Sequence, residues 1–210
     1  MTRAQARALA EVGPGVVLAN CGDSVDWSQE FGRRAPLGVE IGFGMGHALL
    51  EWAGQCPDWN LIGVETYEPG IGALLLGVER SALGNVRVVA EDARLAFESC
   101  FQPTSLNEVR VFFPDPWPKR RHHKRRLIQS EFASSIVSRM RVGARLLLAT
   151  DWRDYAESML EVLDDEPRLT NMAGTGCFSA RPETRSPTRF EDRGHELGYA
   201  VWDLAYARNC

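Results

Sequence analysis

Apolar positions along the chain follow two alternating spacings from about residue 37 to residue 165. Short runs of consecutive apolar residues, typical of strands buried on both faces, stand at 37–41, 61–65, 86–90, 108–113 and 144–150. Stretches with apolar residues at helical spacing stand at 46–55, 70–83, 125–140 and 153–165. Strands that alternate with helices predict an α/β fold with a doubly wound, mostly parallel sheet.

Two regions lie outside this alternation. Residues 1–35 form an N-terminal segment, in which the Ala-rich stretch 4–11 predicts one short helix. Residues 177–197 are rich in Pro, Arg and Thr, and such a long loop in a compact domain is usually functional or disordered. The alternating stretch 199–208 predicts a closing strand, which we expect to be antiparallel. We therefore expect one domain over residues 36–210, with 177–197 as its substrate-binding loop.

The charge of the chain is unevenly distributed. The 210 residues carry a net charge of −4, which fits an acidic globular domain. Six of the eight residues from Lys119 to Arg126 are nevertheless Lys or Arg. Such a run is usually a solvated face or a tail, but this one lies in the middle of the chain between apolar segments. It therefore indicates a local anion-binding surface on a negatively charged protein.

The five cysteines predict neither a disulfide framework nor a zinc site. Their number is odd, their spacings are wide, and no C-x-x-C occurs. We expect buried free thiols in a reducing compartment, and no bound metal. No signal peptide is apparent at the N-terminus, and no apolar run approaches the length of a membrane span. These features predict a cytoplasmic protein without membrane association.

A glycine-rich turn follows the first predicted strand. Gly42, Gly44 and Gly46 form G-x-G-x-G, and glycines at such a turn let the backbone approach a ligand closely. Glu40 precedes the turn, and a carboxylate there would repel a pyrophosphate but suit a cationic cofactor such as S-adenosylmethionine. A dinucleotide-dependent dehydrogenase is disfavoured, because its third glycine would stand where this chain has His47.

Further acidic residues follow the later strands. Glu65 stands where a carboxylate accepts both ribose hydroxyls, Asp92 could accept the adenine amine, and Asp115 and Asp151 follow the next two strands. Ligands in open α/β sheets bind beyond the carboxyl ends of the strands, where the strand order reverses. We therefore expect the glycine turn and Asp115 to face each other across one crevice. The alternative is that these acids only cap the helices that follow them.

The sequence PDPWPKRRHHKRR combines a rigid corner with the basic run. Pro114 and Pro116 fix the backbone on both sides of Asp115. Trp117 offers a flat face on which a base could stack, although it could equally be a core aromatic. The basic run would contact phosphates, with a salt-dependent contribution to affinity. We interpret the adjacent histidines 122 and 123 as RNA contacts or solvated residues rather than metal ligands.

With these motifs in place, the chain resembles the bacterial tRNA (guanine-N7-)-methyltransferases, from about residue 31 to residue 208. The segments EIGFGMG, PGIGALL, EDA, FFPDPWPKRRHHKRR, TDW and TRFEDRGHELG carry the resemblance. It implies a Rossmann-like class I methyltransferase that uses S-adenosylmethionine to form N7-methylguanosine in the tRNA variable loop. The implied partner is tRNA, and we expect a monomer or a homodimer.

The resemblance also implies roles for single residues. Asp115 would be catalytic. The cofactor would be bound by Glu40, Gly42, Gly44, Glu65, Asp92 and Asp115. The substrate nucleotide would be contacted by Lys119, Asp151, Thr188, Arg189, Phe190 and Glu191. The RNA would lie along Arg121, His122, His123, Lys124, Arg125 and Arg126. The chain departs from the family pattern in lacking a basic N-terminal arm and in having Tyr199 where a histidine is usual.

The chemistry of guanine N7 requires no general base, because N7 keeps a free lone pair at neutral pH. We therefore expect Asp115 to orient the base and to favour the positive charge that moves onto the purine ring. Two other functions remain open at this point. One is a methyltransferase acting on exocyclic amines of nucleic acids or on protein amides, and the other is a non-catalytic RNA-binding module on the same fold.

Overall fold

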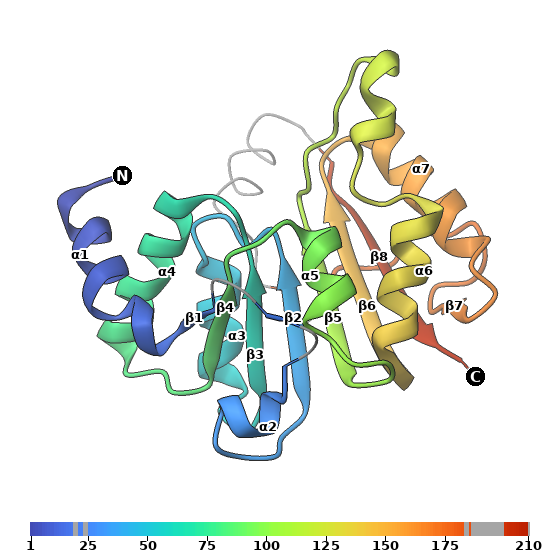
Figure 1. Cartoon of the computed structure of the whole chain (residues 1–210). Helices are drawn as coiled ribbons and strands as arrows, with labels where there is room; N and C mark the ends of the chain where they lie inside the picture. The colour runs from blue at the N-terminus through green and yellow to red at the C-terminus, as the bar shows by residue number, and fades with distance from the viewer. Residues whose placement is uncertain (19–20, 23–24, 183–184, 186–199, 210) are drawn as a thin grey trace.

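A central sheet of eight strands organises the part of the chain that the computed structural model describes, residues 1–18, 21–22, 25–182, 185 and 200–209 (Figure 1). The strand order is β1-β4-β3-β2-β5-β6-β8-β7. The strands are β1 (Val17–Leu18), β2 (Leu37–Ile41), β3 (Asn60–Val64), β4 (Val86–Val89), β5 (Leu106–Phe112), β6 (Met140–Thr150), β7 (Leu169–Asn171) and β8 (Trp202–Arg208).

Helices cover both faces of this sheet. They are α1 (Arg3–Glu11), α2 (Trp27–Glu30), α3 (His47–Gln55), α4 (Glu68–Ser81), α5 (Ala93–Ser99), α6 (Ser130–Arg139) and α7 (Arg153–Asp164), with 3-10 turns η1 (Gly13–Gly15) and η2 (Arg120–Arg125). Helices α1, α3 and α4 share one apolar core cluster with strands β3 and β4. Helices α5, α6 and α7 share another with the strands from β2 to β8. The buried apolar runs of the sequence are therefore sandwiched between two helical layers.

The predicted topology is confirmed. Strands β1 to β6 pair in parallel along the sheet, and β8 pairs antiparallel with β6. The edge strands β1 and β7 and the short helices α2 and α5 were not predicted. Elements of two to seven residues carry too few positions for a periodic signal, and the pairing that creates an edge strand is a tertiary contact.

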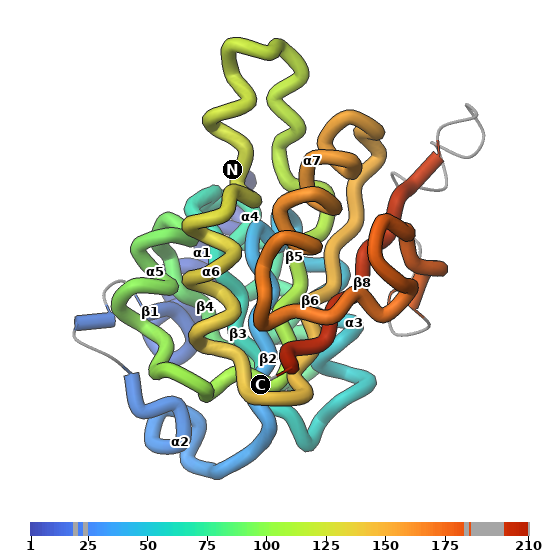
Figure 2. The backbone as a smooth tube through the Cα atoms, turned by 90° about the vertical axis from the view of Figure 1, so that its right-hand side faces the viewer, coloured from blue at the N-terminus to red at the C-terminus, as the bar shows by residue number. Residues whose placement is uncertain are grey.

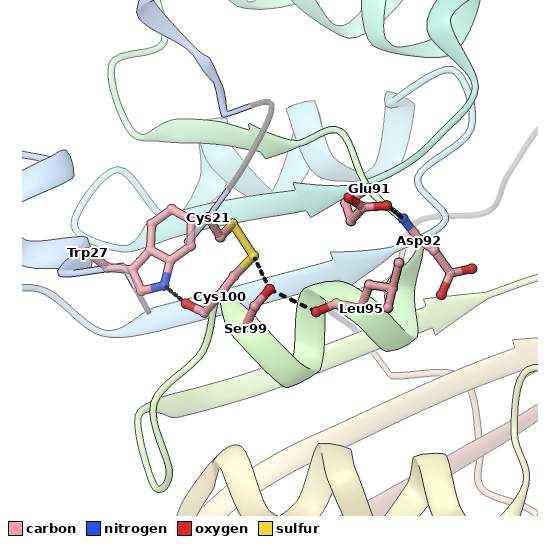
Figure 3. The surroundings of a disulfide bond; sticks show 7 residues. All are labelled: Cys21, Trp27, Glu91, Asp92, Leu95, Ser99 and Cys100. Atoms are coloured by element: carbon pink, nitrogen blue, oxygen red, sulfur yellow. Dashed lines mark hydrogen bonds between the residues drawn. A yellow bond between two sulfur atoms is a disulfide. The ribbon is translucent and has the colours of Figure 1, made fainter. Parts of the chain in front are cut away.

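The prediction that all cysteines are free thiols is wrong for two of them. Cys21 and Cys100 form a disulfide across 79 residues of sequence, with Cα atoms 5.1 Å apart, while Cys56 and Cys177 are free. Cys210 lies outside the described residues. Figure 3 shows the bond at the end of α5, where the Trp27 indole nitrogen donates to the Cys100 carbonyl at 2.9 Å. The spacing of cysteines could not reveal this pair, because only the folded chain brings them together.

No metal-binding cluster of three or more His, Cys, Asp or Glu residues occurs among the residues that the structure describes. Within the same ranges, none of the helices has the length and apolar character needed to cross a bilayer.

Candidate active site

Acidic residues lie at the carboxyl ends of adjacent parallel strands. They are Glu40 in β2, Glu65 after β3, Asp92 after β4, Asp115 after β5 and Asp151 after β6. The five strands are neighbours in the sheet, and the chain order reverses between β2 and β5. Ligands of open α/β sheets bind at such a reversal. The fold therefore gathers these residues at the carboxyl ends of the strands. The turn after β2 and the corner after β5 lie on either side of the reversal point (Figure 1).

Glu40 is buried, with only 3% of its surface exposed. Its Cα stands opposite Arg110 of β5, and its Oε2 atom has no hydrogen-bond partner within the described part of the chain. Burial raises the pKa of Glu40 to about 7, and the positive charge of Arg110 acts in the opposite direction. A buried carboxylate with an open acceptor atom at a ligand-binding edge is suited to a cationic ligand.

Arg110 is a residue of this site that sequence reasoning missed. It is 2% exposed, its Nε donates to Glu108 at 2.6 Å, and its guanidinium lies 3.6 Å from the Trp52 ring centroid. Its position in an otherwise apolar strand run was a usable signal, because an arginine is rarely buried unless it is paired. Arg110 provides the positive charge nearest to Glu40 across the strand pair.

The turn after β2 is shaped for close approach to a ligand. Gly42 and Gly44 have φ of +68° and +55°, left-handed values that favour glycine, and a Cβ on either would point into open space. Helix α4 supports the turn from the other side, since a Cβ on Gly70 would lie only 2.1 Å from the Gly44 carbonyl oxygen. The sequence motif around Gly70 did not reveal this role, because the contact joins two separate elements.

Glu65 ties the glycine turn to the start of α4. One carboxylate oxygen accepts from the Gly44 amide at 2.9 Å, and the other accepts from the amides of Thr66 and Tyr67 at 2.8 and 3.0 Å. A carboxylate offers about four acceptor sites, so three are in use. Binding a ribose diol would require the carboxylate to share an oxygen or to release one amide.

Asp92 has a local role of the kind that the alternative interpretation described. It is the N-cap of α5, and its Oδ1 accepts from the Arg94 amide at 2.8 Å. The residue is exposed, and the capping bond uses only its Oδ1 atom. Capping fixes the position of the carboxyl group at the strand ends, and this does not conflict with a ligand contact.

The corner that carries Asp115 has an unusual backbone. Phe113 and Trp117, on either side of it, have φ of +51° and +44°, values rare for large side chains. Asp115 itself is exposed at the strand ends. Trp117 is half-buried, with the Arg125 guanidinium 4.9 Å from its ring centroid and the edge of His122 against it. In this arrangement part of the indole surface predicted to stack on a base is covered by the chain's own basic residues.

The basic segment, residues 119–126, projects from the sheet. Figure 2 shows the yellow-green tube around residue 120 extending well beyond the strand ends. Its exposed cations are Lys119, Arg120, Arg121, Lys124 and Arg125. His122 and His123 are half-buried, and His123 lies 3.7 Å from the Asp154 carboxylate. The surface therefore presents five solvent-exposed positive charges to a partner.

Arg126, which we predicted to lie along the RNA, has different surroundings from the other cations of the segment. Its side chain is 2% exposed and bonds inside the protein, to the Pro116 carbonyl and the Asp154 carboxylate. The sequence pattern could not distinguish it from its neighbours, because burial of the residue that follows a short 3-10 turn depends on what packs against it.

A cavity of about 570 Å³ adjoins the basic segment on the side of α5 and α6. None of the acidic strand-end residues lines it, so it is separate from the rim that contains Glu40. Its lining combines two cations, two carboxylates, three neutral polar side chains and one phenylalanine: Arg94, Glu98, Lys124, Gln129, Ser130, Glu131, Phe132 and Ser135.

Only some of the remaining predicted substrate contacts lie among the described residues. Lys119 and Asp151 are exposed at the strand ends. The predicted contacts Thr188, Arg189, Phe190 and Glu191 lie outside the described residues, as does Tyr199. Next to that stretch, the buried Arg185 donates to the Asp203 carboxylate at 2.7 and 2.9 Å, and Trp152, beside Asp151, is 42% exposed. Sequence reasoning gave these three residues no role.

The residues at the strand ends fit a ligand with a cationic group and a purine nucleoside. Among the described residues, Glu40 offers a buried carboxylate oxygen without a partner, and Gly42 and Gly44 leave open space above the backbone. The carboxylates at five strand-end positions favour a positively charged ligand over a phosphate. S-adenosylmethionine, with its ammonium and sulfonium groups, has these properties.

Known proteins are similar to this chain over most of its length. A family profile described as "Putative methyltransferase" matches residues 34–204. The chain is 47% identical to the tRNA (guanine-N(7)-)-methyltransferase of Idiomarina loihiensis over 100% of this chain and 85% of that protein. It is 49% identical to the enzyme of the same name from Paraburkholderia xenovorans, over 97% of this chain and 78% of that protein.

Solved structures with the same fold are more distant in sequence. The 16S rRNA methyltransferase KamB has a TM-score of 0.63 at 16% identity, covering 93% of this chain and 99% of that one. The 16S rRNA (adenine(1408)-N(1))-methyltransferase from Catenulisporales acidiphilia has a TM-score of 0.60 at 15% identity, covering 92% and 99%. At these identities the likeness shows the shared fold alone.

Proposed function

Since the chain belongs to the tRNA (guanine-N(7)-)-methyltransferase family, we propose that it transfers a methyl group from S-adenosylmethionine to N7 of a guanine in tRNA. The finer parts of the proposal are that this guanine lies in the variable loop and that the reaction takes place in the cytoplasm. The protein would act as a monomer or a homodimer.

One observation carries the proposal for the methyl donor. Glu40 is a buried carboxylate with an oxygen that lacks a partner within the described residues, at the edge of the sheet where ligands bind. A ligand ammonium group would supply that partner and would neutralise the buried charge. Glu65 and Asp92, on the two strands beyond β2, then lie on the side where the ribose and adenine would be bound.

Bound S-adenosylmethionine supplies an electrophilic methyl group on a sulfonium centre. The protein's own part is to hold the guanine so that its N7 lone pair faces that methyl group, because effective positioning is a large contribution to such transfers. Asp115 can accept a hydrogen bond from the base and can favour the positive charge that develops on the purine ring. N7 carries no proton, so no residue has to act as a general base.

The RNA would bind across the strand ends and the basic segment. The exposed cations of this segment would contact phosphates, with Lys119 nearest to the Asp115 corner. Asp151 follows β6 on the same edge and could accept the amino and imino donors of guanine. We retain Thr188, Arg189, Phe190 and Glu191 as further contacts to the substrate nucleotide.

The test is methylation of an unmodified tRNA transcript with labelled S-adenosylmethionine, followed by nuclease digestion and mass spectrometry of the nucleosides. We expect N7-methylguanosine at one position in the variable loop. Asp115→Asn should lower kcat by roughly 10²-fold or more while the protein remains folded. A label on an exocyclic amine, or near-normal turnover by the Asn variant, would contradict the assignment.

A further inference from the structure

Arg126 differs from the other cations of the basic segment in its surroundings. Lys119, Arg120, Arg121, Lys124 and Arg125 are exposed, whereas Arg126 is 2% exposed. It is the last residue of the segment and follows η2 directly. One residue of a run that resembles a uniform phosphate-binding surface therefore points into the protein.

The side chain of Arg126 joins the Asp115 corner to α7. Its Nε donates to the Pro116 carbonyl at 3.0 Å, and its Nη2 bonds to the Asp154 carboxylate in the first turn of α7. The guanidinium lies 4.9 Å from the ring centroid of Tyr155. The hydroxyl of Tyr155 in turn accepts from the Ile128 amide at 3.1 Å. Both ends of the loop from 113 to 129 are thus fixed to the same helix.

These contacts leave Arg126 poorly placed to bind phosphate. Its charge is already paired with Asp154, and the guanidinium of Arg126 lowers the pKa of that carboxyl group. To reach an RNA, Arg126 would have to leave the Tyr155 ring and the Pro116 carbonyl, which would lose its donor. The other cations of the segment are already exposed to solvent.

Arg126 contacts the backbone of the corner where residues adopt unfavourable left-handed conformations. Pro116 stands between Asp115 and Trp117, and both Phe113 and Trp117 have left-handed φ values. Large residues hold such conformations only where surrounding contacts impose them. The Arg126–Pro116 bond is such a contact, from outside the corner to the peptide group between Pro116 and Trp117.

We propose that Arg126 is a positioning residue: through its bonds to Pro116 and Asp154 it holds Asp115 and the basic segment in register with the strand ends, and it does not bind RNA. This role rests on the proposed function, because it assigns to Asp115 the orientation of the target guanine. Arg126 acts through the corner and does not itself touch the substrate.

The test compares Arg126→Met with Arg121→Met, two variants that each remove one positive charge from the same segment. We expect Arg126→Met to lower kcat roughly 10- to 100-fold while the salt dependence of tRNA binding keeps its slope. Arg121→Met should show the reverse pattern, with a raised KM for tRNA and a salt slope reduced by about 1. Arg126→Lys, which retains one donor, should recover part of kcat.

Asp154→Asn provides a second variant in case Arg126→Met does not fold. The Asp154 side chain is 60% exposed, so its replacement should leave the fold intact while weakening the bond to Arg126. We expect kcat to fall by a smaller factor than in Arg126→Met, and the salt dependence of tRNA binding to keep its slope. The proposal is overturned if Arg126→Met or Asp154→Asn keeps kcat, or if Arg126→Met reduces the salt slope as Arg121→Met does.

Hydrogen exchange separates this proposal from the proposed function. In the free protein, Arg126→Met should speed exchange of the backbone amides of residues 113, 115 and 117, whereas Arg121→Met should not. If the wild-type protein forms no N7-methylguanosine, the proposed function fails while the exchange data still report on the positioning contact. Unchanged exchange in Arg126→Met would refute the positioning role whatever the activity.

Discussion

At the scale of single residues, the site depends on a carboxylate whose charged form is disfavoured by burial. Glu40 is buried beside one arginine, and its pKa of about 7 means that in the free protein it is partly protonated near neutral pH. A cationic ligand shifts the protonation equilibrium of Glu40 the other way, because it favours the ionised carboxylate. The residue that binds the ligand therefore links ligand affinity to pH.

The first prediction concerns the affinity for S-adenosylmethionine. Between roughly pH 5.5 and 7.5 the affinity should rise with pH, since protonated Glu40 must lose its proton before it pairs with the ligand ammonium. Calorimetric titration across this range measures the effect directly. Glu40→Gln should bind more weakly and show no rise, and a rise that persists in this variant would assign it to another group.

The same carboxylate affects the stability of the ligand-free protein with a definite sign. The pKa in the folded state lies above the ordinary value of 4.5, so stability present at low pH is lost as pH rises through about 7. The shift corresponds to roughly 3 kcal/mol at most. Urea unfolding should therefore show that Glu40→Gln gains stability over the wild type above pH 7, and not at pH 5.

At the scale of elements, the glycine turn and α4 form one unit. The Cβ of an alanine at Gly70 would collide with the Gly44 carbonyl, a backbone atom that can move only if the turn moves. Glu65 closes the same unit through its bonds to the amides of Gly44 and Tyr67. The shape of the ligand-binding turn thus depends on a helix that follows the next strand.

Gly70→Ala should accordingly weaken S-adenosylmethionine binding by about tenfold or more and destabilise the fold by roughly 1–3 kcal/mol. Gly54→Ala is the matched control, because Gly54 also lies in a helix but its Cβ would meet no atom of the described residues within 4 Å. That variant should be neutral or slightly more stable. Equal ligand affinity in the two variants would show that the turn does not depend on α4.

The disulfide is a second feature at this scale. It links the N-terminal region to the end of α5, whose other end carries Asp92 (Figure 3). Closing a loop of this length stabilises a protein by about 4 kcal/mol in the chain-entropy description. Such bonds are rare in reducing compartments, so the bond and the proposed cytoplasmic location imply opposite redox environments.

Reduction should therefore lower the free energy of unfolding of the oxidised protein, by up to about 4 kcal/mol in urea titrations. The double variant Cys21→Ser, Cys100→Ser should show no effect of reductant, while Cys177→Ser should respond like the wild type. Alkylation under denaturing conditions during cell lysis, followed by mass spectrometry of the intact protein, reports the state in the cell. Five alkylated cysteines would mean that the bond is absent there.

At the scale of the whole molecule, an acidic protein presents one basic projection beside an acidic rim. The rim attracts a cationic ligand, and the projection attracts a polyanion, so the two partners are directed to neighbouring places. With Arg126 buried, five exposed cations remain for phosphates. Affinity for tRNA should then fall roughly 10²- to 10³-fold between about 50 and 200 mM salt, as filter binding can measure. A fall of less than tenfold would mean that most of these cations do not meet phosphates.

Much of this protein follows from its sequence. The alternation of apolar runs with helical spacing determined the order of the main strands and helices, because both periodicities are local properties of the chain. The acidic residues at strand ends were placed correctly relative to the sheet, since parallel strands must end on the same edge. The basic run was visible because charge is a property of composition.

What only the tertiary structure decided are the contacts between distant elements. The pairing of Cys21 with Cys100, the approach of Gly70 to Gly44, and the burial of Arg126 against Asp154 each join segments that lie far apart in the chain or depend on what packs between them. Identical residue types, such as Arg121 and Arg126, acquire different roles for this reason. Local sequence sets what a side chain can do, and its neighbours in space determine which of those possibilities it uses.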